Sequence, residues 1–316
     1  MRILVASPIF PDTLKKLREE HDVVEAFNAP EDELKSHIAD REVLVFRSGV
    51  NITGDVMACA PNLRLLIRAG SGLDNLDMTY VQEHDLKLVR VPGPGARAVA
   101  ELAFAFMLAL ARQVPLADRL TRQGRWAKHE IRGYLLADKT LGIYGAGNIG
   151  TQVGQMGAAW GMHVIGSVEH PSPARAASLG EQGIRLADSR ELLTTSDFLS
   201  LHVPLQDSTR NLIDAGAIAQ MKRGAFLINL ARGGVVDEEA LHDALKEGHL
   251  GGAGMDVHND EGEGRISPLA DLANVVLTPH MGAGTVDSQR RIGERILEII
   301  ATHRLEEPAD SGGRKA

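Results

Sequence analysis

The sequence predicts an α/β protein made of two doubly wound parallel-sheet domains with a cleft between them. Two observations lead to this prediction. Short apolar runs alternate with helical stretches along nearly all of the 316 residues, as a parallel sheet covered by helices requires. A glycine-rich turn lies in the middle of the chain, at residues 145–150, between an apolar run and a helical stretch. A separate α/β unit must therefore precede that turn, and the chain is long enough for two hydrophobic cores.

The part of the chain before residue 95 supplies five strand candidates. Each is a short apolar run, and the stretches between them look helical. We expect strands at residues 3–6, 23–26, 43–47, 65–68 and 88–91, and helices at residues 13–20, 31–39, 54–59 and 78–84. This alternation predicts a flavodoxin-like parallel sheet.

A long apolar segment leads from this part to the glycine-rich turn. Residues 98–111 are apolar on nearly all sides of a helix, and the helical pattern of residues 97–122 is broken near Pro115. A helix that is apolar all round must be buried on all faces. We therefore expect residues 98–111 to be a buried helix.

A second series of strands and helices begins at the turn. Its strands are expected at residues 141–144, 163–166, 198–202, 225–230, 252–257 and 275–277, and a last helix at 287–303. From residue 305 the chain is charged and contains glycine and proline, so we expect it to be frayed. The predicted domains are residues 1–95 plus 285–316 for substrate, and residues 96–284 for a dinucleotide. The cleft between them would hold the substrate against the cofactor.

The glycine-rich turn carries the pattern G-x-G-x-x-G. Gly145 permits a tight turn, Gly147 lets a pyrophosphate approach the backbone, and Gly150 lets the helix pack close to the strand. The helix that begins at Asn148 and Ile149 offers free N–H groups and a positive dipole end to the phosphates. Because the apolar run before the turn and the amphipathic stretch after it fit a Rossmann-like unit, we predict a dinucleotide site here.

The bulk composition excludes several function classes. The formal net charge of −8 argues against nucleic acid as the main partner. No apolar run approaches the ~20 residues that span a bilayer, and the N-terminal apolar run is too short for a signal peptide. The single cysteine, Cys59, is compatible with a reducing cytosol. We therefore expect a cytoplasmic protein that binds neither nucleic acid nor a membrane, and we predict no metal site.

Three polar residues follow strands of the second sheet, where ligands of open α/β sheets bind. Arg232 follows the run 226–231, Glu261 lies in the loop after 255–257, and His280 follows 275–279. An arginine can grip a carboxylate and polarise the adjacent carbonyl. A histidine can donate a proton to that carbonyl as a hydride arrives, and a carboxylate behind the imidazole fixes its tautomer and favours its protonated form. This set predicts hydride transfer to a 2-keto acid.

Each of these residues also has a structural interpretation. His280 alone could be a hydrogen-bonded structural histidine, and Arg232 alone could pin a loop. Glu261 lies in a run of acids with Asp260 and Glu263, and we expect most side chains of such a run to be solvated. The combination of all three with a dinucleotide site favours the catalytic interpretation.

With these residues in place, the chain resembles the D-2-hydroxyacid dehydrogenase family, and within it the phosphoglycerate dehydrogenase branch. The similarity covers the chain to about residue 303. It rests on residues 68–75, 145–150, 202–205, 229–238, 254–257 and 278–283.

The resemblance implies roles for several residues. Arg232, Glu261 and His280 would be the catalytic set, and Asp256 would hold the nicotinamide carboxamide. The substrate carboxylate would bind the backbone of Gly70, Ser71 and Gly72. Further cofactor contacts would come from Asn148, Ile149, Val203, Pro204, Leu230, Ala231 and Gly282. The resemblance also implies a homodimer built around residues 98–111.

The chain departs from the family pattern in three places. Gly262 stands where a proline usually follows the catalytic glutamate, so Glu263 is an alternative partner for His280. Val168 stands where the ribose-binding acid is expected, with Glu169 one residue later. Glu169 favours NAD, whereas the missing acid and the nearby Arg175 leave NADP as the alternative. The loop 92–97 lacks the asparagine of the phosphoglycerate branch, so the substrate pocket can differ.

The resemblance also suggests a second anionic group on the substrate. Arg47 matches a family position that contacts phosphate, and Lys128 matches a basic position that reaches the neighbouring subunit's site; both could instead be solvated surface charges. The sequence predicts an NAD(P)-dependent D-2-hydroxyacid dehydrogenase, most like D-3-phosphoglycerate dehydrogenase, acting on a phosphate- or phosphonate-bearing hydroxy acid. The alternatives are a hydroxypyruvate or glyoxylate reductase and an NAD(H)-sensing, corepressor-like binding protein.

Overall fold

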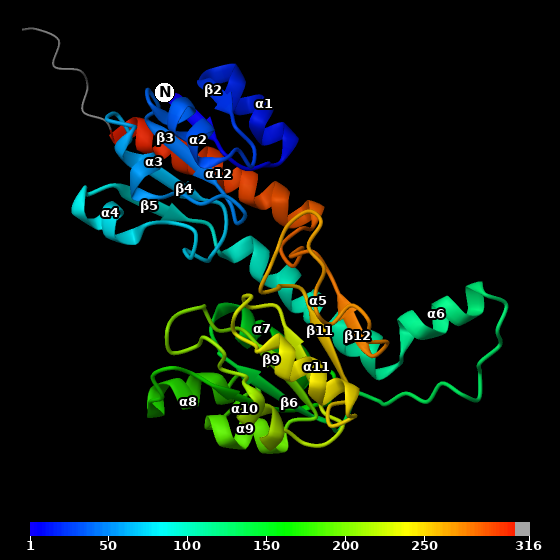
Figure 1. Ribbon diagram of the computed structural model, residues 1–316. Coiled ribbons are helices and arrows are strands. Elements are labelled where there is room, and N and C mark those ends of the chain that lie inside the picture. The colour runs from blue at the N-terminus through cyan, green and yellow to red at the C-terminus, as the bar shows by residue number, and fades with distance from the viewer. Residues whose placement is uncertain (307–316) are drawn as a thin grey trace, which may run out of the picture. The chain divides into compact units, whose positions relative to one another are not determined.

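The computed structural model describes residues 1–306, with side chains to residue 303 (Figure 1). The expectation of a frayed tail therefore falls mostly outside the described residues. The chain divides into two compact units. The first contains Met1–Gly95 and the C-terminal residues from Ala283, and the second is Ala96–Gly282.

The first unit is built on a five-stranded parallel sheet. Its strands are β1 (Arg2–Val5), β2 (Asp22–Glu25), β3 (Val43–Phe46), β4 (Leu65–Arg68) and β5 (Lys87–Arg90). Their order, β2-β1-β3-β4-β5, is that of flavodoxin-like sheets. The helices are α1 (Pro11–Glu20), α2 (Glu31–Ile38), α3 (Gly54–Ala58), α4 (Met78–Glu83) and α12 (Val286–Glu306).

Both faces of this sheet are covered by helices. Successive side chains of a strand point to opposite faces, so Leu4 joins one core and Ile3 and Val5 join the other. The core around Leu4 includes side chains of α2, α3 and α4. The second core includes Leu17 of α1 and the isoleucines of α12. The C-terminal helix is therefore an integral part of the first unit.

The second unit contains a seven-stranded parallel sheet. Its strands are β6 (Thr140–Tyr144), β7 (His163–Ser167), β8 (Arg185–Leu186), β9 (Phe198–Leu201), β10 (Phe226–Asn229), β11 (Gly252–Met255) and β12 (Val275–Leu277). The order β12-β11-β10-β9-β6-β7-β8 is the Rossmann order with a seventh strand added. The prediction of two doubly wound parallel-sheet units is confirmed.

Helices cover both faces of this sheet as well. The helices of this unit are α5 (Gly93–Ala111), α7 (Asn148–Ala159), α8 (Pro173–Gly180), α9 (Ser189–Thr195), α10 (Ala215–Gln220) and α11 (Glu238–Lys246), together with α6 (Val114–Arg122), which has no buried residue. The core that contains Leu199, Leu227 and Ala253 is filled by side chains of α9, α10 and α11. On the opposite face α5 packs against β11, where a Cβ on Gly254 would lie 2.8 Å from the Phe106 ring. Glycines in β11 therefore let α5 approach the sheet.

Helix α5 corrects one expectation from the sequence. Among the described residues, α5 is long and apolar enough to cross a membrane, judged by length and composition alone. From the sequence we expected no apolar run near the ~20 residues that span a bilayer. The structure extends the helix back to Gly93, and 61% of its apolar window is buried. The core helix of a soluble protein passes the same test, because burial in protein and burial in lipid select similar side chains. The predicted break near Pro115 is confirmed: Gln113 has a left-handed φ of 51° before α6 begins.

Candidate active site

The glycine-rich turn joins β6 to α7 as predicted. Gly145 has a φ of 93°, and a Cβ on it would lie 2.9 Å from the carbonyl oxygen of His202. A Cβ on Gly150 would lie 2.3 Å from the carbonyl oxygen of Gly145, so only glycine lets α7 start this close to the strand. No atom lies within 4 Å of a Cβ built on Gly147. The turn therefore leaves open space above its backbone at the position where a pyrophosphate would approach.

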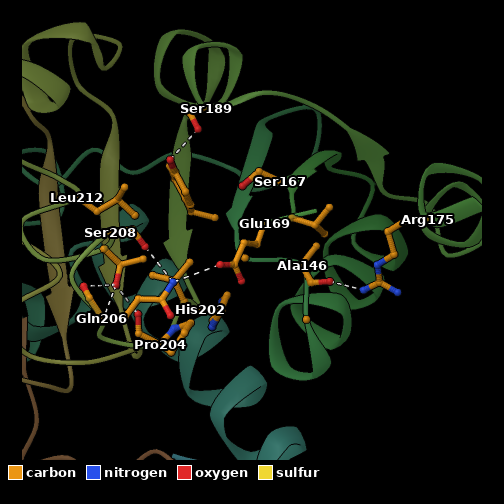
Figure 2. Close-up of a pocket in the computed structure, with 16 residues that line it drawn as sticks. Ala146, Ser167, Glu169, Arg175, Ser189, His202, Pro204, Gln206, Ser208 and Leu212 are labelled. Carbon is orange, nitrogen blue, oxygen red and sulfur yellow. Dashed lines mark hydrogen bonds between the residues drawn. The ribbon is translucent and has the colours of Figure 1, made fainter. Parts of the chain in front are cut away.

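A cavity of about 510 Å³ lies beside this turn (Figure 2). Its walls are the ends of β6, β7 and β9 and the segment that follows β9. They contain Tyr144, Gly145, Ala146, Gly147, Ser167, Val168, Glu169, Arg175, Ser189, His202, Val203, Pro204, Gln206, Ser208, Thr209 and Leu212. Five predicted cofactor contacts lie in this wall: Gly145, Gly147, Glu169, Val203 and Pro204. Asn148, Ile149 and Gly150 follow directly in the first turn of α7.

The acidic and basic side chains of this cavity lie after β7. Val168 stands beside Ser167, the last residue of β7, and Glu169 follows it. The Glu169 carboxylate accepts a hydrogen bond from the Gln206 side chain, with 3.4 Å between Oε1 and Nε2. Arg175 donates from Nη2 to the carbonyl oxygen of Ala146. An acid and a guanidinium therefore both reach the wall of one cavity (Figure 2).

His202 also lines this cavity, although the sequence analysis assigned it no role. Its Nε2 lies 2.9 Å from Oγ of Ser200, and its Nδ1 is buried without a hydrogen-bond partner among the described residues. Burial lowers the pKa of His202 to about 3, because a charged imidazole loses its hydration there. The imidazole therefore stays neutral near pH 7 and adds no positive charge beside the glycine turn.

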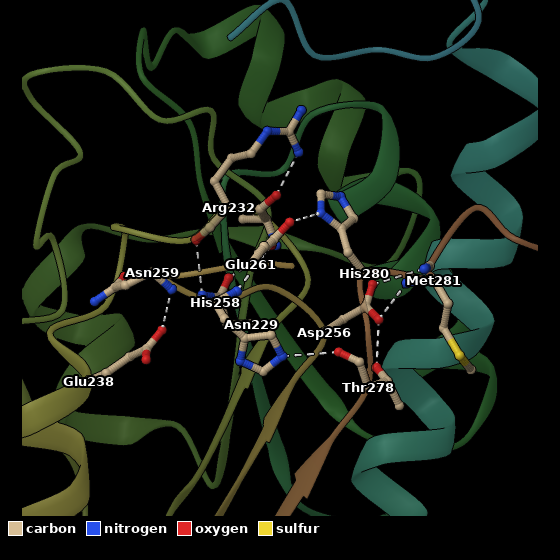
Figure 3. Close-up of polar contacts among 12 residues, drawn as sticks. Asn229, Arg232, Glu238, Asp256, His258, Asn259, Glu261, Thr278, His280 and Met281 are labelled. Carbon is tan, nitrogen blue, oxygen red and sulfur yellow. Dashed lines mark hydrogen bonds and ion pairs between the residues drawn. The ribbon is translucent and has the colours of Figure 1, made fainter. Parts of the chain in front are cut away.

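The loops after β10, β11 and β12 bring the predicted catalytic residues to one edge of the sheet (Figure 3). Nδ1 of His280 lies 2.8 Å from Oε2 of Glu261. The structure thus pairs His280 with Glu261, which answers the choice that the sequence left open between Glu261 and Glu263. His280 has a left-handed φ of 50°, and its N–H donates to the carbonyl oxygen of Asp256 at 2.7 Å. The backbone therefore fixes the direction in which the imidazole extends.

Three influences set the charge of Glu261. Burial alone would raise the pKa of its carboxyl. The hydrogen bond and charge of His280 lower it, as does the N–H of His258, which donates to Oε1 at 3.1 Å. The net result is a lowered pKa, so Glu261 is an ionised acceptor at neutral pH.

Arg232 is placed by a turn that begins at the end of β10. Asn229 is buried, and its side chain accepts from the Ala231 N–H and donates to the carbonyl oxygen of Arg232. The guanidinium donates from Nη1 to the carbonyl oxygen of Ala231 at 2.6 Å. Figure 3 shows its side chain extending from the turn at the same edge as the Glu261–His280 pair. Leu230 and Ala231, two predicted cofactor contacts, are buried in this turn.

Asp256 supports the turn that carries His280. It is buried, and its carboxylate accepts from the Thr278 hydroxyl at 2.5 Å and from the N–H groups of Met281 and Gly282 at 2.9 and 2.8 Å. These contacts give Asp256 a supporting role that the sequence did not indicate. Its predicted contact with a nicotinamide carboxamide stays a prediction.

The predicted substrate residues Arg47, Gly70, Ser71 and Gly72 belong to the first unit, whereas the residues above belong to the second. Arg47 follows β3, and burial lowers the pKa of its guanidinium. Burial is the only influence on that pKa, and no acidic side chain pairs with the guanidinium among the described residues. The loop after β4 is held by Arg68, whose Nε donates to the carbonyl oxygen of Gly72 at 2.8 Å.

Lys128 lies in the second unit and is exposed beside α6. The described residues contain no group of three or more histidine, cysteine, aspartate or glutamate side chains able to hold a metal ion.

Comparison with known proteins identifies the family to which the chain is similar. Residues 104–282 match the model of the family described as D-isomer specific 2-hydroxyacid dehydrogenase, NAD binding domain. A D-3-phosphoglycerate dehydrogenase of Methanocaldococcus jannaschii is 40% identical over 300 residues, which cover 95% of this chain and 57% of that protein. The chain thus spans little more than half of the length of this relative.

Two further proteins match over nearly their whole length. A hydroxypyruvate reductase of Thermotoga maritima is 39% identical over 302 residues, covering 95% of this chain and 97% of that protein. The crystal structure of a D-lactate dehydrogenase from Aquifex aeolicus, complexed with NAD and lactic acid, superposes with a TM-score of 0.84 at 27% identity and covers 96% of each chain. The chain belongs to the D-isomer specific 2-hydroxyacid dehydrogenase family and carries its NAD-binding domain.

Proposed function

We propose that this protein is an NAD(P)-dependent D-2-hydroxyacid dehydrogenase that interconverts a 2-hydroxy acid and its 2-keto acid. The observation that carries the proposal is the Glu261–His280 pair, 2.8 Å apart, at the same sheet edge as Arg232. The glycine turn and its cavity, in the same unit, fit a dinucleotide. When bound, the nicotinamide would supply the hydride in reduction and accept it in oxidation.

The side chains divide the remaining work. Arg232 would bind the substrate carboxylate and polarise the neighbouring carbonyl. Because Glu261 holds Nδ1 of His280, Nε2 is the nitrogen available to the substrate. In reduction Nε2 would donate a proton to the carbonyl oxygen, and in oxidation it would accept the hydroxyl proton. The ionised Glu261 would stabilise the imidazolium.

We infer that the substrate carries a second anionic group, as a phosphate- or phosphonate-bearing hydroxy acid does. Arg47 supports this inference, because it is a partly buried guanidinium that no acidic side chain neutralises among the described residues. A phosphate is the group that such a fork of donors binds well. Lys128 would be a further anion contact, supplied to the site of a neighbouring subunit.

The second candidate is a hydroxypyruvate or glyoxylate reductase. The Thermotoga maritima relative favours it, since that protein is named hydroxypyruvate reductase and matches over nearly its whole length. Both candidates use the same residues of the second unit and differ in what Arg47 contacts.

A substrate panel followed by nicotinamide absorbance tests the proposal. NADH and NADPH would each be paired with glyoxylate, pyruvate, hydroxypyruvate, 2-oxoglutarate, 3-phosphohydroxypyruvate and a phosphonate analogue. We expect the highest kcat/KM with a doubly anionic substrate. Preference for small monoanions would contradict the role of Arg47 and favour the reductase. Tight NADH binding without turnover would contradict both and favour an NAD(H)-sensing binding protein.

We propose that Glu169 binds the ribose hydroxyls and favours NAD over NADP. Its carboxylate is held at the cavity wall by Gln206, and it would repel a 2′-phosphate. Glu169→Gln is therefore expected to raise kcat/KM with NADPH by about 5-fold relative to NADH, since one removed like-charge contact is worth roughly 1 kcal/mol when water screens it. Glu181→Gln, an exposed acid beyond the end of α8, is the control. An unchanged NADH/NADPH ratio in Glu169→Gln would contradict the assignment.

We propose that the protein is a homodimer formed through α5 and α6. Trp126 is 81% exposed and lines an apolar groove of about 780 Å³ with Leu108, Val114 and Ile131. A second copy of the chain would bury such an exposed apolar surface in a two-fold interface. Sedimentation of the protein and of Trp126→Glu tests this: a wild-type monomer would contradict it.

We also propose a cytoplasmic location without nucleic-acid or membrane partners, which the net charge of −8 and the single cysteine support.

A further inference from the structure

One buried carboxylate near the catalytic pair has no part in the reaction described above. Glu238 opens α11 and is only 3% exposed. Its Oε1 accepts the backbone N–H of Asn259 at 2.7 Å (Figure 3). Burial raises the pKa of Glu238, and this outweighs the lowering by the hydrogen bond from Asn259 and by the charge of His258; the negative charge of Glu261 adds a smaller increase. Burying a carboxylate at this position costs folding free energy. We therefore expect its contact with Asn259 to serve a function.

Asn259 connects two loops of the site. Its side-chain Oδ1 accepts the N–H of Gly234 at 2.6 Å, while its own N–H donates to Glu238. Both partners lie in the segment after β10, which also contains Arg232. The loops also touch through their backbones, since a Cβ on Gly233 would lie 1.9 Å from the carbonyl oxygen of His258. Residue 259 is thus tied at two points to the segment that carries Arg232.

The chain beyond Glu261 offers little support for that residue. Gly262 and Gly264 have φ angles of 137° and 76°, and a Cβ built on Gly264 would have no atom within 4 Å. The residues from Asp260 to Arg265 are exposed. These residues contact one another, since Arg265 pairs with Asp260 and donates to the carbonyl oxygen of Gly262. Apart from the Glu261–His280 pair itself, the ties of this loop to other segments are made on the N-terminal side of Glu261, by His258 and Asn259.

We propose that Glu238 is a positioning residue that anchors Asn259 and thereby holds Glu261 against His280 and beside Arg232. The inference rests on the proposed function, because it explains how two parts of one catalytic set keep their spacing. A different role, stabilising the N-terminus of α11, is already filled by Asp237, whose side chain accepts the N–H groups of Glu239 and Ala240. The exposed Glu239 adds a further acid to that first turn.

Three variants separate these roles. Glu238→Ala removes the acceptor, Glu238→Gln keeps an oxygen acceptor but removes the charge, and Glu239→Ala removes a neighbouring exposed acid from the same turn. We expect Glu238→Ala to lower kcat by about 10- to 100-fold, as a displaced catalytic group does, with the KM for NADH unchanged. Glu238→Gln should recover most of kcat, and Glu239→Ala should match the wild type. If Glu238→Ala proves unstable, Asn259→Ala tests the second tie of the same residue: it removes the Oδ1 acceptor of the Gly234 N–H and keeps the backbone N–H that Glu238 binds, and it should also lose kcat.

A spectroscopic measurement keeps the inference separate from the proposed function. The imidazole Nδ1–H proton of His280, assigned with a His280→Gln variant, reports its hydrogen bond to Glu261 by NMR. It should be observed in the wild type and Glu238→Gln, and should be lost to solvent exchange in Glu238→Ala. This readout remains valid even if no substrate is turned over, which would contradict only the proposed function. Retention of both the NMR signal and kcat in Glu238→Ala would overturn the inference. Equal losses in Glu238→Gln and Glu238→Ala would overturn it too, because they would show that charge and not the anchor is needed.

Discussion

Replacing His280 by alanine is expected to lower kcat by about 10²- to 10⁴-fold, the usual contribution of a general acid, while NADH binds with nearly unchanged affinity. The imidazole lies in the turn after β12, and the cavity beside the glycine turn is lined by other residues. The substitution removes the proton donor and leaves Asp256 to hold the turn through Thr278, Met281 and Gly282. Single-turnover kinetics and NADH fluorescence titration would measure the two effects separately.

A second histidine provides the control for this experiment. His163 is exposed at the start of β7, and His163→Ala should retain wild-type turnover. Near-normal turnover in His280→Ala would remove the proposed acid from the mechanism. A parallel loss of NADH affinity would instead show that the substitution disturbs the cofactor site.

The sequence predicted the fold because its strongest signals are local. Apolar runs of four or five residues located most strands to within one or two residues, and the glycine spacing located the start of α7. The shortest element was missed: β8 has two residues, Arg185 and Leu186, too few for a recognisable pattern. The start of α5 was also placed too late, because Gly93-Pro94-Gly95 has the composition of a loop, yet tertiary packing extends the helix through it.

The candidate site was predictable to the extent that it depends on strand ends. Parallel strands end at one edge of the sheet, so Arg232 and His280 were expected together. The sequence favoured Glu261 and left Glu263 as an alternative, because the partner of His280 depends on the path of a glycine-rich loop. The Glu238–Asn259 contact was invisible for a different reason. A buried acid in the first turn of a helix has the same sequence pattern as an exposed one, and only tertiary structure distinguishes them.

Gly233→Ala is expected to disturb both stability and turnover. No left-handed φ is required at Gly233, so the conflict is one of space alone: the new methyl would lie 1.9 Å from the carbonyl oxygen of His258. That atom belongs to the backbone, which cannot rotate away as a side chain can. The loop carrying Glu261 must therefore move from the turn carrying Arg232, at a cost of about 1–3 kcal/mol in the free energy of unfolding and a loss on the order of 100-fold in kcat/KM.

Gly180→Ala is the matched control, because a Cβ there meets nothing within 4 Å and no positive φ is involved. It should keep wild-type turnover and equal or slightly exceed the wild-type Tm, since alanine reduces the entropy of the unfolded chain. Thermal unfolding and steady-state kinetics of the two variants distinguish two mechanisms of loss. A lowered Tm with normal kcat/KM in Gly233→Ala would mean that the loops separate without affecting the reaction, which would contradict the catalytic role of their spacing. A normal Tm with a large loss of kcat/KM would mean that the loops can part while the fold survives, and that their contact is needed mainly to hold Glu261 and Arg232 at a working distance.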